Sequence, residues 1–246
     1  MHTATYAPSY SAAVLSFMDQ RTAETHGGFF LAQLRPGLRV LDAGCGPGTI
    51  TLGLARKVAP GLVTGIDVED SQFGNAHEQA ERERLNVEFR KASVYELPFP
   101  DRSFDAVFSH ALFEHLSDPG AALAELRRVL KPGRLLGLRA GDMGGILIDS
   151  ESEGPGQGLA TYLANREKNS GDPYVGRKLG RLLRKAGFTV QSMTASYDVI
   201  SETLLKIGPS LAEQFAAPSY CSLRDDAADD SLFVALAWCE AIGRAQ

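Results

Sequence analysis

The sequence predicts a doubly wound α/β fold built around one mostly parallel sheet. Short apolar runs alternate with longer stretches of helical spacing from Leu38 to about Ala140, which is the pattern of successive strand-helix-strand units. A chain of 246 residues, 44% of them hydrophobic, can also bury the core of one large domain. We therefore expect a single domain over residues 1–246.

Seven strands and several helices are expected in alternation. The predicted strands are rich in Val, Leu, Ile and Phe and cover 38–43, 62–68, 87–92, 104–109, 134–140, 189–200 and 232–242. The last run is continuously apolar and also suits a helix, but we favour a strand. Helical spacing predicts helices over 49–58, 71–84, 119–130, 175–186 and 201–216, and two short ones within 1–35.

Composition narrows the class of protein. A net charge of −5 and a pI near 5.6 disfavour nucleic acid as a partner, because binding phosphates needs a basic face. Three scattered cysteines without a CxxC pair predict neither a disulfide framework nor a metal site. We find no apolar run of about 20 residues that would span a membrane and no signal peptide pattern, so we expect a cytoplasmic protein.

A glycine-rich turn follows the first predicted strand. The segment reads Gly44-Cys45-Gly46-Pro47-Gly48 and leads directly into a helix. Residues without a Cβ let the backbone turn tightly and approach a ligand closely. Pro47 lacks the N–H that a loop cradling phosphates would use, so the turn suits a ligand without a pyrophosphate.

An acidic residue ends the second predicted strand. Asp67 lies about 20 residues after the turn, where a carboxylate can accept hydrogen bonds from ribose hydroxyls. A nicotinamide dinucleotide is the competing ligand, but its fingerprint requires a small residue where Thr49 stands. The chain also has no recognisable Tyr-x-x-x-Lys pair, which disfavours an NAD(P)-linked oxidoreductase.

The turn and three later segments resemble class I S-adenosylmethionine-dependent methyltransferases. These segments are 97–105, 110–116 and 127–133, and the similarity covers roughly residues 38 to 140. Within the family, the chain is most similar to the small-molecule subgroup that includes ubiquinone and menaquinone biosynthesis enzymes. The resemblance implies a seven-stranded Rossmann-like methyltransferase fold and methyl transfer from S-adenosylmethionine to a small-molecule acceptor, with S-adenosylhomocysteine as product. Whether O, C or N is methylated stays open, and a non-catalytic S-adenosylmethionine-binding protein is the alternative.

The resemblance also assigns residues to the cofactor. Asp42 would orient the turn and the methionine ammonium, Asp67 would hold the ribose, and Val68 would pack on adenine. Many relatives carry an Asp where Ser93 stands, so a hydroxyl replaces a carboxylate at the adenine end. The full cofactor set is Asp42, Gly44, Cys45, Gly46, Gly48, Thr49, Asp67, Val68, Ser93, Val94 and His110. Cys45 is read as a packing residue rather than a nucleophile.

Methyl transfer from a sulfonium needs orientation more than covalent machinery. If the acceptor must lose a proton, His110, Asp142 or a tyrosine are the candidate bases. Candidate acceptor-binding residues, each of which also suits an ordinary surface position, are Tyr6, Tyr10, His26, Arg139, Tyr174 and Arg177.

Four parts of the domain are expected. They are a helical cap over 1–35, a cofactor-binding core over 36–140, a glycine-rich lid-like insertion over 141–177, and the rest of the sheet with a helical insertion over 178–246. We expect a monomer or a homodimer.

Overall fold

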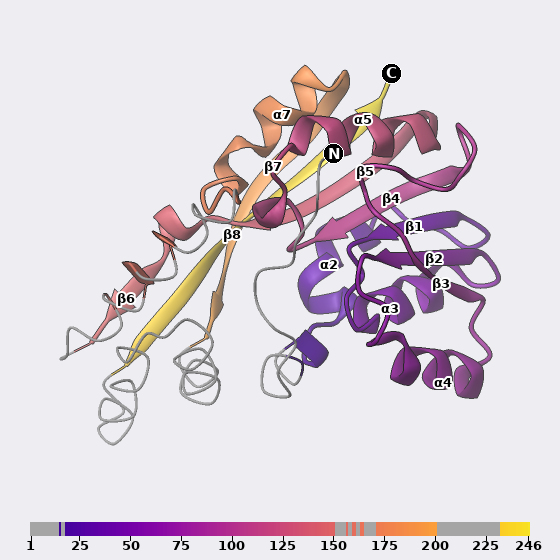
Figure 1. The fold of residues 1–246 in the computed structure, drawn as a ribbon, viewed down its shortest axis with the longest axis horizontal. Coiled ribbons are helices and arrows are strands. Elements are labelled where there is room, and N and C mark those ends of the chain that lie inside the picture. The colour runs from indigo at the N-terminus through magenta and orange to yellow at the C-terminus, as the bar shows by residue number, and fades with distance from the viewer. Residues whose placement is uncertain are drawn as a thin grey trace.

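One mixed sheet organises the protein in the computed structural model, which describes residues 15, 18–150, 156, 159–160, 163–164, 171–200 and 232–246. The strands are β1 (Arg39–Ala43), β2 (Leu62–Asp67), β3 (Val87–Lys91), β4 (Phe104–His110), β5 (Leu130–Gly141), β6 (Leu147–Asp149), β7 (Phe188–Val199) and β8 (Phe233–Ala245). They lie in the order β3-β2-β1-β4-β5-β8-β6, and β7 pairs with the other edge of β8 (Figure 1). Strands β1 to β5 are parallel, whereas β8 runs antiparallel to its neighbours.

Helices cover both faces of this sheet, which confirms the doubly wound class. On one face lie α2 (Ala23–Leu31), α3 (Thr49–Val58) and α4 (Phe73–Glu83); on the other lie α5 (Pro119–Val129) and α7 (Leu179–Lys185) (Figure 1). Three 3-10 helices complete the described elements: η1 (Phe113–His115), η2 (Met143–Gly145) and η3 (Gly176–Lys178). No helix among the described residues is long and apolar enough to cross a membrane.

Local chemistry fixes where these helices begin. The Asp118 side chain accepts a hydrogen bond from the Ala121 N–H at 3.0 Å, and Pro119 occupies the first turn of α5. Leu123 and Leu126 are fully buried on the inner side of α5 against β4 and β5. The helix therefore starts at its expected position because a cap and a core-facing stripe agree.

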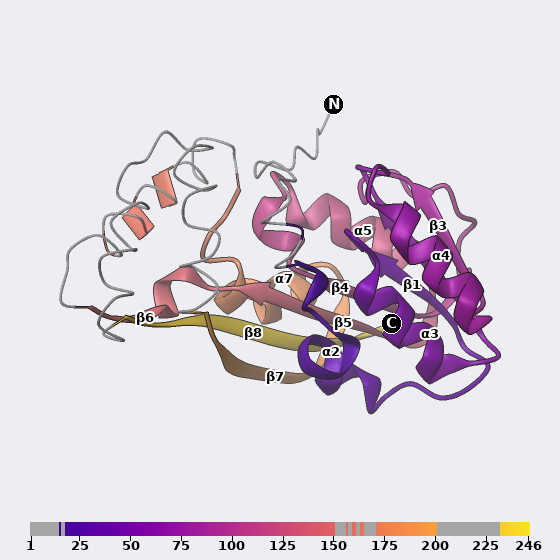
Figure 2. The same cartoon turned by 90° about the horizontal axis from the view of Figure 1, so that it is seen from below.

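The half of the sheet after β5 differs most from the expectation. The predicted strand at 134–140 begins earlier, at Leu130, and the terminal run forms strand β8 rather than a helix. The short strand β6, within the predicted lid 141–177, pairs with β8 beyond the end of β5 and brings the sheet to eight strands (Figure 2). The predicted helix over 201–216 lies outside the described residues.

Packing of α2 on the sheet depends on Gly137. A Cβ built on Gly137 would lie 2.4 Å from Cδ2 of Phe30, whose ring is fully buried. We expect Gly137→Ala to lower the free energy of unfolding by about 1–3 kcal/mol, because a buried ring has little room to move. Gly28→Ala is the matched control, since its Cβ would meet nothing within 4 Å and α2 would gain about 0.5–1 kcal/mol. Urea denaturation of both variants measures the difference, and equal stability would contradict this packing.

Candidate cofactor and acceptor site

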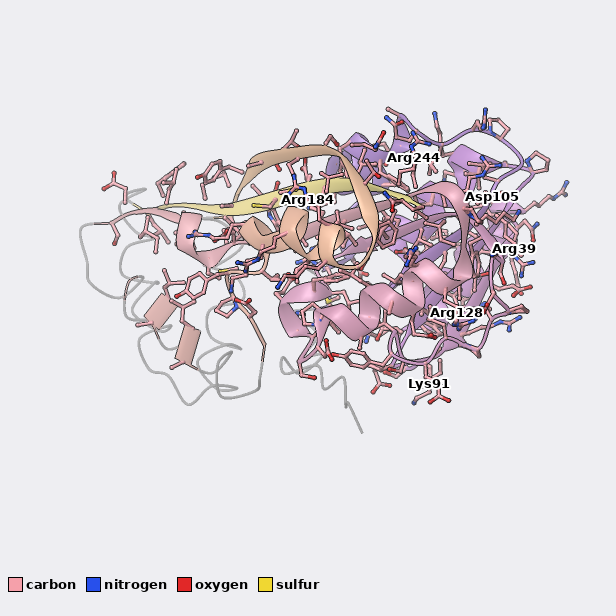
Figure 3. All side chains as sticks on the ribbon, turned by 90° about the horizontal axis from the view of Figure 1, so that it is seen from above. Arg39, Lys91, Asp105, Arg128, Arg184 and Arg244 are labelled. Carbon is pink, nitrogen blue, oxygen red and sulfur yellow. The ribbon has the colours of Figure 1, made fainter. Side chains whose placement is uncertain are left out.

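The glycine-rich turn lies at the carboxyl edge of the sheet, between β1 and α3. The N–H groups of Gly44 and Cys45 both donate to the Ile66 carbonyl oxygen, at 2.8 and 2.9 Å, which ties the turn to β2. Gly48 has a φ of +83°, and a Cβ there would lie 2.7 Å from the Phe89 ring. Glycine is therefore required at position 48 by both conformation and space. Arg39 and Asp105, labelled in Figure 3, mark the opposite, amino edge of the sheet.

Asp67 lies against this turn, as the sequence spacing predicts. Its Oδ2 accepts the Gly46 N–H at 2.9 Å, and its Oδ1 accepts the Glu69 N–H at 3.1 Å. Burial raises the pKa of the Asp67 carboxyl, while these backbone hydrogen bonds act in the opposite direction. The turn and the acid thus form one unit across β1 and β2.

Asp42 lies on β1, two residues before Gly44, and its side chain is on the face of the sheet that α3 covers. The carboxyl is buried, and its Oδ2 accepts a hydrogen bond from the Thr51 hydroxyl at 2.7 Å. Burial raises the pKa of Asp42 to about 7, the Thr51 hydrogen bond lowers it, and the nearby Asp67 charge raises it. Asp42 is therefore poised to change its charge near neutral pH.

The other predicted cofactor residues border this unit. Thr49 begins α3, and burial raises the pKa of the Cys45 thiol well above its usual value, which fits a packing residue. At the end of β3, the Ser93 hydroxyl accepts the Tyr95 N–H at 3.2 Å and Val94 is buried. Val68, directly after β2, is half-buried.

A second group of predicted residues meets where β4, β5 and β8 lie side by side. His110 and Arg139 are register partners on β4 and β5, and Arg139 is in turn the partner of Glu240 on β8. His26 reaches them from α2, with its ring centroid 5.2 Å from that of His110. The structure thus brings together His110, Arg139 and His26, which were predicted from separate segments.

Arg139 is held as a buried cation. Its side chain is 1% exposed, its Nη2 donates to both carboxylate oxygens of Asp198 at 2.9 and 3.0 Å, and its Nε donates to Glu240 at 3.3 Å. The guanidinium also lies 4.4 Å from the centroid of the Trp238 ring. Two carboxylates offset the charge of this buried cation, as burial requires.

Asp142, Tyr174 and Arg177 form a different cluster. Asp142 is buried and accepts from the Arg177 backbone N–H at 3.0 Å and from the Arg177 guanidinium at 2.6 and 2.7 Å, while that guanidinium lies 5.8 Å from the Tyr174 ring centroid. Asp142 also accepts the Gly144 N–H at 3.1 Å. These contacts favour an anchoring role between η2 and η3, and the role of Asp142 as a base stays a prediction. Tyr6 and Tyr10 lie outside the described residues.

Sequence reasoning missed four residues of the site: Thr51, Asp198, Trp238 and Glu240. Trp238 and Glu240 are two apart on β8, so they project to the same face, and period-two spacing in the terminal run could have suggested this. Asp198 is separated from Arg139 by 59 residues, and no local pattern links them. Within the described part of the chain, no group of three or more His, Cys, Asp or Glu side chains is placed to hold a metal ion.

Residues 40–133 match the model of a methyltransferase domain family. An uncharacterized methyltransferase of Schizosaccharomyces pombe is 41% identical over 130 residues, which is 50% of this chain and 47% of that protein. The ubiquinone biosynthesis O-methyltransferase of Hahella chejuensis is 34% identical over 120 residues, 48% of this chain and 45% of that protein. The chain spans about half the length of such curated relatives.

Solved structures share the fold. The geranyl diphosphate C-methyltransferase of Streptomyces coelicolor superposes with a TM-score of 0.59 at 18% identity, covering 91% of this chain and 78% of that one. The [4+2]-cyclase SpnF superposes with a TM-score of 0.55 at 24% identity, covering 99% and 85%. Because a cyclase and a methyltransferase share this fold, the fold alone does not determine the reaction. The likeness to methyltransferases therefore depends on the sequence match of residues 40–133. Residues 40–133 are thus similar in sequence to a methyltransferase domain, and the described part of the chain shares the fold of the solved methyltransferases.

Proposed function

We propose that the protein binds S-adenosylmethionine at the unit formed by the glycine-rich turn and Asp67, and transfers its methyl group to a small molecule. The observation that carries this proposal is the Gly46 N–H to Asp67 Oδ2 hydrogen bond of 2.9 Å, which joins the turn to an acid at the carboxyl edge. Ligands of open α/β sheets bind at this edge. The glycines of the turn leave space for a ligand, and the half-buried Asp67 carboxylate can accept hydrogen bonds from its hydroxyls. Both features fit a ligand that carries a ribose.

Each residue of the unit has a separate task in this proposal. Asp67 accepts hydrogen bonds from the ribose hydroxyls, and Val68, Ser93 and Val94 border the adenine. Asp42, held by Thr51, places negative charge beneath the turn on the methionine side. When bound, S-adenosylmethionine supplies an electrophilic methyl group on a positively charged sulfur. The remaining tasks of the chain are to align the acceptor atom with that methyl group and to exclude water.

A proton acceptor is needed only for acceptors that lose a proton. The contacts of His110 and Asp142 do not favour this role, because the Asp142 oxygens accept hydrogen bonds from Arg177 and the His110 Nε2 lies 3.1 Å from Arg139 Nη1. We therefore propose that the acceptor is already unprotonated at the reacting atom, or that its proton leaves to water.

The experiment is a methyl-transfer assay by mass spectrometry. Purified protein is incubated with S-adenosylmethionine and a panel of quinols, phenols, β-diketones and amines. Formation of S-adenosylhomocysteine together with an equal amount of a product heavier by one methylene unit supports the enzyme. Binding of S-adenosylhomocysteine with no methylated product from the panel or from a small-molecule cell extract would favour the non-catalytic alternative. Binding of NAD(P) instead would favour an oxidoreductase.

A further inference from the structure

Two buried rings that carry N–H donors, His110 on β4 and Trp238 on β8, pack against each other across β5. His110 is 6% exposed and Trp238 is 3% exposed. Their ring centroids lie 4.9 Å apart in an edge-to-face arrangement. Both rings project from the sheet on the side of α2, next to the buried Arg139.

The partner of His110 determines which of its nitrogens carries the proton. Arg139 Nη1 lies 3.1 Å from His110 Nε2. A guanidinium can only donate, so Nε2 must accept and must be unprotonated. Burial and the positive charges of Arg21 and Arg139 hold the pKa of His110 well below its ordinary value, so the ring is neutral. A neutral ring that accepts at Nε2 carries its hydrogen on Nδ1.

Apart from the backbone of His110 itself, neither N–H donor has an acceptor among the described residues. His110 Nδ1 and Trp238 Nε1 are both buried without a hydrogen-bond partner in that part of the chain. Buried donors are paired in the great majority of cases, so each unpaired one calls for a partner such as a ligand, a water molecule or an ion. An indole nitrogen can only donate, so the missing partner is a hydrogen-bond acceptor and not a donor.

The position of the two N–H donors in the sheet indicates that they bind the methyl acceptor rather than the cofactor. Asp67 and the turn lie on β2 and β1, whereas the two donors lie on β4 and β8, and β5 separates those two strands. Neighbouring strands are about 4.8 Å apart, so Trp238 projects from a strand roughly 14 Å from β1. The site therefore extends past the turn along the sheet edge, toward the strands that hold Arg139.

We propose that His110 Nδ1–H and Trp238 Nε1–H bind an oxygen atom of the methyl acceptor, and that the acceptor is an oxygen acid such as a phenol, an enol or a carboxylic acid. The inference rests on the proposed function. Two N–H donors stabilise an oxygen atom, and most strongly one that carries negative charge. They disfavour an ammonium group, which has only donors and a positive charge.

Trp238 provides a direct test because it is the only tryptophan in the 246-residue chain. In a 15N-labelled protein saturated with S-adenosylhomocysteine, the single indole N–H signal is followed by NMR during titration with 4-hydroxybenzoate, catechol, acetylacetone and benzylamine. We expect a saturable downfield shift with at least one oxygen acid and none with benzylamine. A shift with benzylamine, or no shift with any oxygen acid, would overturn the inference.

Two matched variants separate the donors from the packing around them. His110→Asn keeps an N–H near the Nδ1 position, whereas His110→Gln keeps a group toward Arg139 and loses that donor. We expect His110→Gln and Trp238→Phe each to weaken the oxygen acid by about tenfold, and His110→Asn to weaken it less. Affinity for S-adenosylhomocysteine should change less than about twofold in Trp238→Phe, which lies outside the predicted cofactor set. Loss of cofactor affinity without loss of acceptor affinity would assign these donors to the methionine carboxylate and overturn the inference.

Failure of this inference and failure of the proposed function give different results. If S-adenosylhomocysteine does not bind the unaltered protein, the proposed function fails. If it binds but the indole signal does not respond to oxygen acids, only the acceptor assignment fails.

Discussion

Asp67→Ala is expected to lower the affinity for S-adenosylhomocysteine by at least about 100-fold. Hydrogen bonds to a carboxylate contribute about 1.5–3 kcal/mol each, and loss of two of them to the ribose costs about 3 kcal/mol or more. The substitution also removes the acceptor of the Gly46 N–H at 2.9 Å, so the turn loses one of its supports. Isothermal titration calorimetry at neutral pH measures the change.

Asp70→Ala is the matched control for this variant. Asp70 lies three residues later, its side chain is 51% exposed, and it forms an ion pair of 3.0 Å with Lys91. Removing an exposed carboxylate should change affinity by no more than about twofold. Asp67→Asn should fall between, because its amide oxygen can still accept the Gly46 N–H. Equal affinity of Asp67→Ala and the unaltered protein would rule out the ribose assignment.

The second large effect is a pH dependence caused by Asp42. The pKa of this carboxyl is raised to about 7 in the unliganded protein, mainly by burial. A bound ammonium group near Asp42 favours the charged form, so binding releases a proton below this pKa. We expect the affinity for S-adenosylhomocysteine to increase by up to about tenfold per pH unit from about pH 5.5 to 7, and to level off above.

Variants at two positions isolate the contribution of Asp42. Asp42→Asn should bind weakly at every pH with a flatter profile, and Thr51→Val should move the profile to higher pH, because its hydrogen bond lowers the pKa of Asp42. A profile that is flat for the unaltered protein and identical in Asp42→Asn would refute the coupling.

Without ligand, the same carboxyl affects stability in the opposite direction. Since its folded pKa exceeds the ordinary value of 3.8, its stabilising contribution is complete below about pH 4 and is lost as the pH rises through about 7. The pKa of His26 is lowered to about 4, so the contribution of His26 to the stability of the folded protein is instead lost as the pH falls from about 6.5 to 4. The effect of Asp42 is therefore measured as the difference between Asp42→Asn and the unaltered protein in urea denaturation across pH.

Local signals predicted the first half of the sheet well. The helix from Thr49 to Val58 was predicted to the residue, because a glycine turn precedes it and its apolar stripe is regular. The segment after β5 was harder, because β6 has three residues and exists only through pairing with the far end of β8. A strand this short has no periodicity of its own to detect.

The candidate site divides in the same way. The turn and Asp67 follow from spacing along one strand-helix-strand unit, and the hydrogen bond between them agrees with that reasoning. Trp238 and Asp198 lie near Arg139 and His110 only because β8 pairs with β5, about 100 residues earlier in the chain, and with β7, about 40 residues earlier. Sequence patterns identify residues within one unit, but pairing across the sheet determines the acceptor half of the site.

The most direct test of the central claim is a calorimetric titration of the purified chain with S-adenosylhomocysteine, NAD and NADP under the same conditions. We predict saturable binding of one S-adenosylhomocysteine per chain, no heat with either dinucleotide, and loss of the S-adenosylhomocysteine signal in Asp67→Ala. Binding of a dinucleotide in place of S-adenosylhomocysteine, or S-adenosylhomocysteine binding that Asp67→Ala leaves unchanged, would contradict the account of this site.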